Sequence, residues 1–300
     1  MTIIPDFLKK GDKIAIVSPA SAIRPEFIDG ACRVLNQWGF VPVPGEHCRN
    51  SNGYYSGTIH QRLADFRSAL HDPDIKAIFC GRGGYGTIHL TDFITPRELA
   101  DHPKWIIGFS DISVLHALCH KAGMASIHSS MARHLALFGA DDSCSMALLD
   151  ILSGRMPSYS IPSHPFNRFG SVKGEIVGGN LAVLGALVHT PFNLLLPDKI
   201  LFIEDIAEPI YKVERFLYNL RLSGVLPQLK ALVVGQFTDY REPDANGDTM
   251  YRMIQRMVEP YKFPVCFNFP IGHIDGNLPI IEGATVSLSV TSTHSSLEFL

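Results

Sequence analysis

The segment at residues 104–120 (KWIIGFSDISVLHALCH) constrains the fold of this chain most. In it a short apolar strand runs directly into a helix. Residues 105–109 form an apolar run typical of a buried strand, and Ile112, Leu115 and Cys119 then recur at helical spacing. Such a tight turn exposes its central residue, and the amide groups of the first helical turn face whatever binds there. Ser110 occupies the turn, where it can be a helix N-cap or a nucleophile.

The same alternation of strands and helices runs through the whole first half of the chain. Further strands are expected at residues 13–18, 40–43, 75–80 and 125–128, and helices at 24–38, 58–70, 87–93 and 143–152. This order is typical of the α/β class and predicts a doubly wound parallel sheet, with binding at the carboxyl ends of its strands.

A change in composition separates the two halves. Residues 153–170 are rich in Pro, Ser and Gly and have no apolar periodicity, so we interpret 156–172 as a linker between domains at 1–155 and 173–300. In the second domain strands are expected at 173–177, 199–203, 231–237 and 284–290, and helices at 181–189, 209–223 and 248–261. This mixed pattern does not determine a topology.

Charge and hydropathy exclude several functional classes. The 300 residues carry a formal net charge of -3, which gives no electrostatic basis for binding nucleic acid. No apolar run approaches the roughly 20 residues that a membrane span needs, and the N-terminal residues lack the pattern of a signal peptide. The six cysteines are scattered without a C-x-x-C pair, as in proteins of a reducing compartment. We therefore expect a cytoplasmic protein.

The glycine-rich segment GRGGYG, at residues 81–86, has three interpretations. It meets the G-x-G-x-x-G pattern of dinucleotide-binding loops, but it lies in the third strand–helix unit and not in the first. It can also be a tight turn that needs positive φ angles. In the third interpretation its amide groups face Ser110 and form part of an oxyanion hole.

Two segments of the second half carry groups suited to acid–base chemistry. The apolar strand LFIED ends in Glu204 and Asp205, whose side chains should face opposite ways because strand residues alternate. The loop GHIDGN, at 272–277, places His273 between glycines, and imidazole suits proton transfer near neutral pH. His116 and His120 share a helix face, but no H-E-x-x-H motif joins them, so we expect no metal site.

Together, the motifs GRGGYG, GFSD, GGNL (178–181), LFIEDIAEPIYKVERFLYNL (201–220) and GHIDGN resemble those of the LD-carboxypeptidases, a family of serine peptidases. The resemblance implies that Ser110 is the nucleophile, Glu204 the acid and His273 the base. It also implies an α/β N-terminal domain and a smaller, β-rich α+β C-terminal domain, with the site between them.

The resemblance further implies a cytoplasmic homodimer without a cofactor, which removes the terminal D-alanine from a peptidoglycan-derived tetrapeptide during cell-wall recycling. Microcin-immunity peptidases share this scaffold and triad but act on acylated nucleotide analogues. A dinucleotide-dependent oxidoreductase and a non-enzymatic sugar- or peptide-binding protein are the alternatives from other classes.

The remaining site residues follow from what such a reaction needs. The oxyanion would be held by the amides of Asp111 and Gly84. Arg82, in the glycine loop, is the candidate for binding the terminal carboxylate, although it can equally pair with a surface acid. Asn180 would line the pocket or, alternatively, cap the helix that follows it. No metal, nucleic acid or membrane partner is expected.

Overall fold

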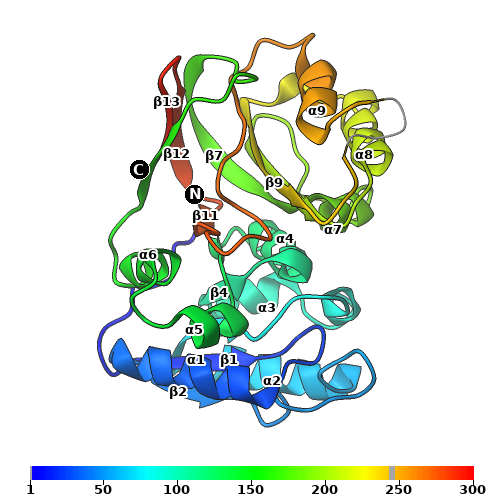
Figure 1. The fold of residues 1–300 in the computed structure, drawn as a ribbon. Coiled ribbons are helices and arrows are strands. Elements are labelled where there is room, and N and C mark those ends of the chain that lie inside the picture. Colours follow the sequence, from blue (N-terminus) through cyan, green and yellow to red (C-terminus); the bar gives the residue numbers. More distant parts are fainter. Residues whose placement is uncertain (1, 243–246) are drawn as a thin grey trace. The chain divides into compact units, whose positions relative to one another are not determined.

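A six-stranded sheet organises the first part of the chain in this computed structural model, which describes residues 2–242 and 247–300 (Figure 1). Its strands are β1 (Lys13–Val17), β2 (Val41–Pro44), β3 (Ile75–Cys80), β4 (Trp105–Gly108), β5 (Ser126–His128) and β11 (Ile280–Glu282). The order is β11-β5-β4-β3-β1-β2; β11 is antiparallel to β5, and the other neighbours are parallel. This order confirms the predicted doubly wound α/β sheet.

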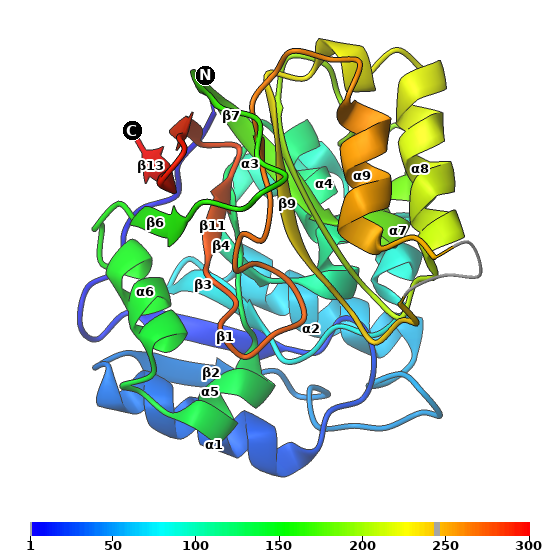
Figure 2. The same cartoon turned by 45° about the horizontal axis from the view of Figure 1, so that its top comes forward.

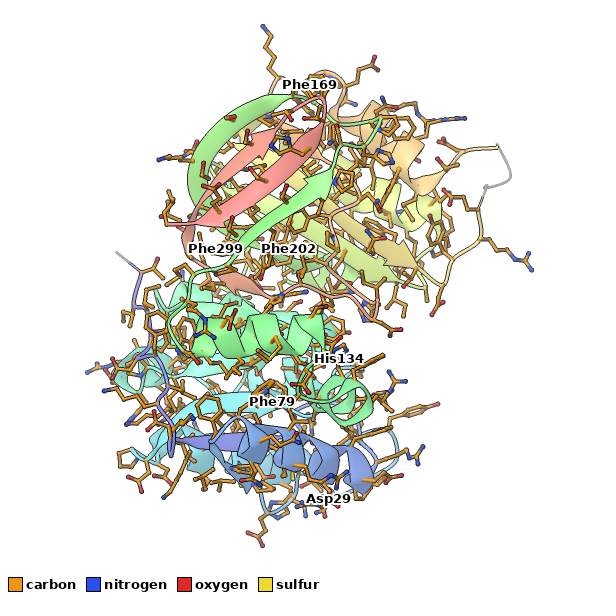
Figure 3. The ribbon with its side chains drawn as sticks, turned by 60° about the vertical axis from the view of Figure 1, so that its left-hand side comes forward. Asp29, Phe79, His134, Phe169, Phe202 and Phe299 are labelled. Atoms are coloured by element: carbon orange, nitrogen blue, oxygen red, sulfur yellow. The ribbon has the colours of Figure 1, made fainter. Side chains whose placement is uncertain are left out.

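Helices connect these strands. They are α1 (Pro25–Gln37), α2 (Ile59–His71), α3 (Pro96–Asp101), α4 (Ser113–Lys121), α5 (Ala132–Phe138) and α6 (Ser143–Leu152), with single 3-10 turns η1 (Thr87–Leu90) and η2 (Ser110–Ile112). Phe66 of α2 and Phe79 of β3 are fully buried, and Figure 3 shows Phe79 between the strands and helices of this unit. The apolar runs that predicted the strands therefore form the core.

A seven-stranded mixed sheet organises the second part of the chain. Its strands are β6 (Ser158–Pro162), β7 (Gly170–Asn180), β8 (Ile200–Ile206), β9 (Ala231–Thr238), β10 (Val265–Cys266), β12 (Thr285–Val290) and β13 (His294–Phe299). The order is β10-β9-β8-β7-β12-β13-β6, in which β10, β9, β8 and β7 are parallel and the rest antiparallel. The helical segments are α7 (Leu181–Ala186), α8 (Ile210–Leu222), η3 (Leu226–Gln228) and α9 (Met250–Val258). Helices α8 and α9 lie side by side (Figure 2).

The division of the chain differs from the predicted domains in two places. The first compact unit contains the residues up to 155 and also 275–283, and the second contains 156–274 and 284–300. The predicted linker at 156–172 was wrong because it contains β6, whose residues are only exposed or half-buried and so give no apolar run. The predicted domain at 173–300 includes β11, which pairs with β5 of the first sheet. Within the described ranges, no helix has the length and apolar character needed to cross a bilayer.

The first helix depends on a glycine for its packing. A Cβ atom on Gly30 of α1 would collide with Ala136 of α5, lying 2.8 Å from its Cα. Helix propensity alone favours alanine over glycine by about 1 kcal/mol. The close contact opposes this gain, because overpacking a well-packed interface costs roughly 1–3 kcal/mol.

We therefore expect Gly30→Ala to lower the thermal unfolding midpoint, although it improves helix propensity. The exposed Asn36 of the same helix is the control, since Asn36→Ala gains propensity without touching α5. A midpoint that rises in both variants would contradict the proposed contact between α1 and α5.

Candidate functional site

Ser110 adopts a backbone conformation that residues other than glycine rarely occupy. Its φ angle is +64°, and it directly follows Phe109, the N-cap of η2. The helix α4 that continues the chain has Ile112 at its N-cap, so Ser110 caps neither element. A strained residue between a strand and a helix, with its side chain at the strand's carboxyl end, is the geometry of a nucleophile elbow. Ser110 is thus not the N-cap of either element, and its role as a nucleophile stays a prediction.

The glycine loop between β3 and η1 lies against this serine. A Cβ atom on Gly83 would be 2.9 Å from the Cβ of Ser110 and 3.1 Å from its Oγ, so a side chain would displace the serine. Gly84 instead packs against Ser21, whose side chain a Cβ would strike, and has a φ angle of +108°. Sequence reasoning singled out Gly84 and missed the contact of Gly83, because the glycine pattern alone does not tell which glycine faces Ser110.

Asp111 joins the glycine loop to the turn that carries Ser110. Its carboxylate is buried and accepts a hydrogen bond of 2.8 Å from the backbone N–H of Thr87, the residue after the loop. A charge-assisted bond to a backbone amide is stronger than a neutral one. The side chain of Asp111 therefore fixes the loop, a role separate from that predicted for its backbone amide.

Glu204 and His273 form a hydrogen-bonded pair in the second unit. Glu204 is fully buried at the carboxyl end of β8, and its Oε2 lies 2.7 Å from Nδ1 of His273. Its other oxygen, Oε1, makes no hydrogen bond within the part of the chain that the structure describes. Burial disfavours the imidazolium, but the hydrogen bond and charge of Glu204, with the charges of Asp205 and Asp239, outweigh it and raise the pKa of His273.

Backbone irregularity brings these two side chains together. Strand β9 has a bulge at Gly235 and Gln236, opposite the end of β8. The N–H of Gln236 donates to the carbonyl of Ile271, which draws the histidine loop across the bulge. Gly272 then approaches Glu204 so closely that a Cβ would lie 2.8 Å from the Cβ of Glu204, and its φ angle is +122°. Only glycine fits this position.

Asp205, the next residue of β8, has hydrogen-bond partners that differ from that of Glu204. It accepts hydrogen bonds from the side-chain amide of Asn180, at 2.8 Å, and from the backbone N–H of Ala182, at 2.9 Å. Burial and then the charge of Glu204 raise the pKa of Asp205 to about 7. Asn180 also caps α7, because its Oδ1 accepts from the N–H of Val183. The capping alternative for Asn180 is confirmed, and a role in the pocket stays a prediction.

The guanidinium of Arg82 is exposed and donates from Nη1 to the carbonyl of Ala22, at 3.0 Å. No carboxylate within residues 2–242 or 247–300 forms an ion pair with it, so the expected alternative of a surface salt bridge is not seen there. Its proposed role in binding a terminal carboxylate stays a prediction.

His116, one of the two histidines of α4, is a structural residue. His116 is buried, with Nδ1 2.8 Å from the hydroxyl of Ser126 and Nε2 2.9 Å from the carbonyl of Gly108. Burial lowers the pKa of His116 to about 4. Among the residues described, no three His, Cys, Asp or Glu side chains are grouped so as to hold a metal ion.

The predicted site residues fall into two sets. The first unit carries Arg82, Gly84, Ser110 and Asp111, and the second carries Asn180, Glu204 and His273. Within the first set the structure joins the glycine loop to Ser110, and within the second it joins His273 to Glu204.

Known protein families match both halves of the chain. A sequence model of the LD-carboxypeptidase N-terminal domain matches residues 14–129, and one of the LD-carboxypeptidase C-terminal domain matches residues 173–288. The chain belongs to the LD-carboxypeptidase family. The predicted resemblance is confirmed, and the chain is placed with carboxypeptidase hydrolases, not with dinucleotide-binding proteins.

Individual relatives agree with this assignment. The murein tetrapeptide carboxypeptidase of Pseudomonas aeruginosa is 33% identical over 87% of this chain and 88% of its own. The crystal structure of muramoyltetrapeptide carboxypeptidase from Oxalobacter formigenes superposes with a TM-score of 0.88, at 27% identity, over 96% of this chain and 98% of that one. The microcin C7 self-immunity protein MccF of Escherichia coli is 24% identical over 97% of this chain and 94% of its own.

The histidine loop offers a matched pair of substitutions that tests the site geometry. Gly272→Ala should lower kcat/KM about 100-fold, because its Cβ would displace Glu204 and a misplacement of about 1 Å can cost that much. Gly276→Ala should leave kcat/KM nearly unchanged, because nothing lies within 4 Å of a Cβ there. Equal effects of the two substitutions on steady-state kinetics would contradict the close approach of Gly272 to Glu204.

Proposed function

We propose that this protein is a serine-type L,D-carboxypeptidase that removes the C-terminal D-alanine from murein tetrapeptides. The bond cleaved joins the L-centre of a diamino acid to that D-alanine. Family membership and the murein tetrapeptide carboxypeptidases among the relatives support the substrate class. The conformation of Ser110 is the observation on which the proposal of a serine nucleophile rests.

In the proposed mechanism His273 removes the proton of Ser110 as its Oγ attacks the scissile carbonyl. Because the Glu204 carboxylate accepts the hydrogen bond at Nδ1, that nitrogen carries the proton, and Nε2 is the nitrogen that acts as base. The imidazolium then protonates the leaving amine of D-alanine, which leaves an ester on Ser110. Water, activated by the same imidazole, hydrolyses the ester and regenerates the serine.

Charge that develops during the reaction needs specific partners. The fully buried Glu204 would stabilise the imidazolium, since a carboxylate in a low-dielectric site interacts strongly with a neighbouring cation. The amides of Asp111 and Gly84 would hold the tetrahedral oxyanion. Arg82 would bind the terminal carboxylate through its exposed guanidinium, and Asn180 would contribute to the pocket. We further propose that the enzyme is a cytoplasmic homodimer that acts in cell-wall recycling and needs no cofactor.

Replacing the nucleophile tests this function. Ser110→Ala should reduce the release of D-alanine from a murein tetrapeptide by at least roughly 1,000-fold, with an unchanged circular dichroism spectrum. Ser68, exposed on α2, provides the control, and Ser68→Ala should retain full activity. Turnover like that of the wild type in Ser110→Ala would refute the assignment of the nucleophile.

A parallel assay separates the two substrate classes within the family. We expect the wild type to release D-alanine from the tetrapeptide and to leave an acylated nucleotide analogue intact. Hydrolysis of the nucleotide analogue alone would instead support a function like that of the microcin self-immunity relative.

The raised pKa of His273 makes a prediction about pH dependence. The base must be neutral to accept a proton, so kcat/KM should rise with pH through the raised pKa of His273 in the free enzyme. Glu204→Gln removes the negative charge that favours the imidazolium. The rise of kcat/KM with pH should therefore shift to lower pH in this variant, while kcat/KM itself falls. A rise that stays at the same pH in this variant would contradict the coupling of the two residues.

A further inference from the structure

Arg62 is a buried cation in the first unit that the proposed mechanism does not use. It lies in α2 and is only 2% exposed. Burying a guanidinium is costly unless its donors are satisfied, and burial does lower the pKa of Arg62. Within the described ranges no carboxylate forms an ion pair with it, so backbone carbonyls, the Tyr55 ring and the more distant charge of Asp111 stabilise its charge.

The guanidinium of Arg62 joins three loops. Nη1 donates to the carbonyl of Pro19, which follows β1, and to that of Gly86, at 2.8 Å, which ends the glycine loop after β3. Nε donates to the carbonyl of Gly57, at 3.3 Å, in the loop that precedes α2. All three loops connect strands of the parallel sheet to the elements that follow, so one side chain sets their spacing.

Neighbouring rings hold the guanidinium in this orientation. Tyr55 lies under it, with the ring centroid 5.2 Å from Cζ, at the distance of a cation–π contact. Nη2 lies 3.1 Å from Nδ1 of His89. Because a guanidinium only donates, this nitrogen of His89 is the acceptor of the hydrogen bond.

The peptide group between Gly86 and Thr87 is held from both sides. Its carbonyl accepts from Arg62, and its N–H donates to the carboxylate of Asp111, the residue after Ser110. A cation on the carbonyl and an anion on the amide polarise the same peptide group, and each bond strengthens the other. This clamp, made by Arg62, the Gly86–Thr87 peptide and Asp111, links α2 to the turn of the nucleophile.

We propose that Arg62 is a positioning residue for the reaction, which holds the glycine loop against Ser110 through the clamp. Gly83, three residues before Gly86, contacts Ser110 with no space for a side chain, so a small shift of the loop changes the surroundings of Oγ. This inference rests on the proposed nucleophilic role of Ser110. Loss of the clamp should reduce the stabilisation of the transition state more than it reduces the affinity for substrate.

The test compares Arg62→Met and Arg62→Lys with Arg67→Met as the control. Arg67 lies on the same helix and binds Glu98 and the carbonyl of Phe93, away from the glycine loop. We expect Arg62→Met to lower kcat on the murein tetrapeptide about 100-fold, with KM changed less than about threefold. Arg62→Lys keeps the positive charge but lacks the several donor groups of the guanidinium, so its kcat should fall about tenfold. This variant provides the test if Arg62→Met does not fold. Arg67→Met should keep the kcat of the wild type.

Two readouts do not depend on the peptide substrate. One is the burst of nitrophenolate as Ser110 is acylated by p-nitrophenyl acetate, and the other is hydrogen exchange at the Thr87 amide. We expect a slower burst and faster exchange in both Arg62 variants, and neither change in Arg67→Met. If the wild type shows the burst but does not cleave the tetrapeptide, the proposed substrate fails while slower bursts still support the role of Arg62. Arg62 variants with a burst and kcat like those of the wild type would overturn the inference, as would a wild type without any burst.

Discussion

A buried carboxylate that holds an imidazole is the interaction on which the second half of this structure depends. Glu204 has no exposed surface, and its hydrogen bond to His273 is what compensates for bringing its charge out of water. The bulge in β9 and the positive φ of Gly272 both serve to bring these two groups within 2.7 Å of each other. The same bond raises the pKa of His273 and selects the nitrogen that can act as base.

In the first unit the main constraint is the strained backbone conformation of Ser110, the residue that carries the proposed nucleophilic hydroxyl. The left-handed backbone of Ser110 is unfavourable on its own and persists only where its surroundings hold it. Gly83 packs against it, and Asp111 and Arg62 grip the same peptide group after the glycine loop. The buried charges of Asp111 and Arg62 therefore support a backbone conformation of Ser110 that is unfavourable for a residue other than glycine.

The sequence predicted the parallel strands well and the site in part, for physical reasons. Strand β3 and helix α6 form where predicted because an apolar run or periodic pattern is bounded by turn residues. Strands β6 and β11 were missed because each depends on a partner far along the chain, β13 and β5 respectively. The motifs drew attention to Ser110, Glu204 and His273, but Gly83 and Arg62 act through tertiary contacts that no local pattern reveals.

The most direct test of the account is whether the pair of Glu204 and His273 activates Ser110. The rate of covalent labelling by a fluorophosphonate, with the modified residue located by mass spectrometry, measures this activation in the absence of any peptide substrate. We expect the wild type to be labelled at Ser110 and His273→Ala to be labelled at least roughly 1,000-fold more slowly. Equal labelling rates in the two proteins, or a label on another residue, would contradict the account.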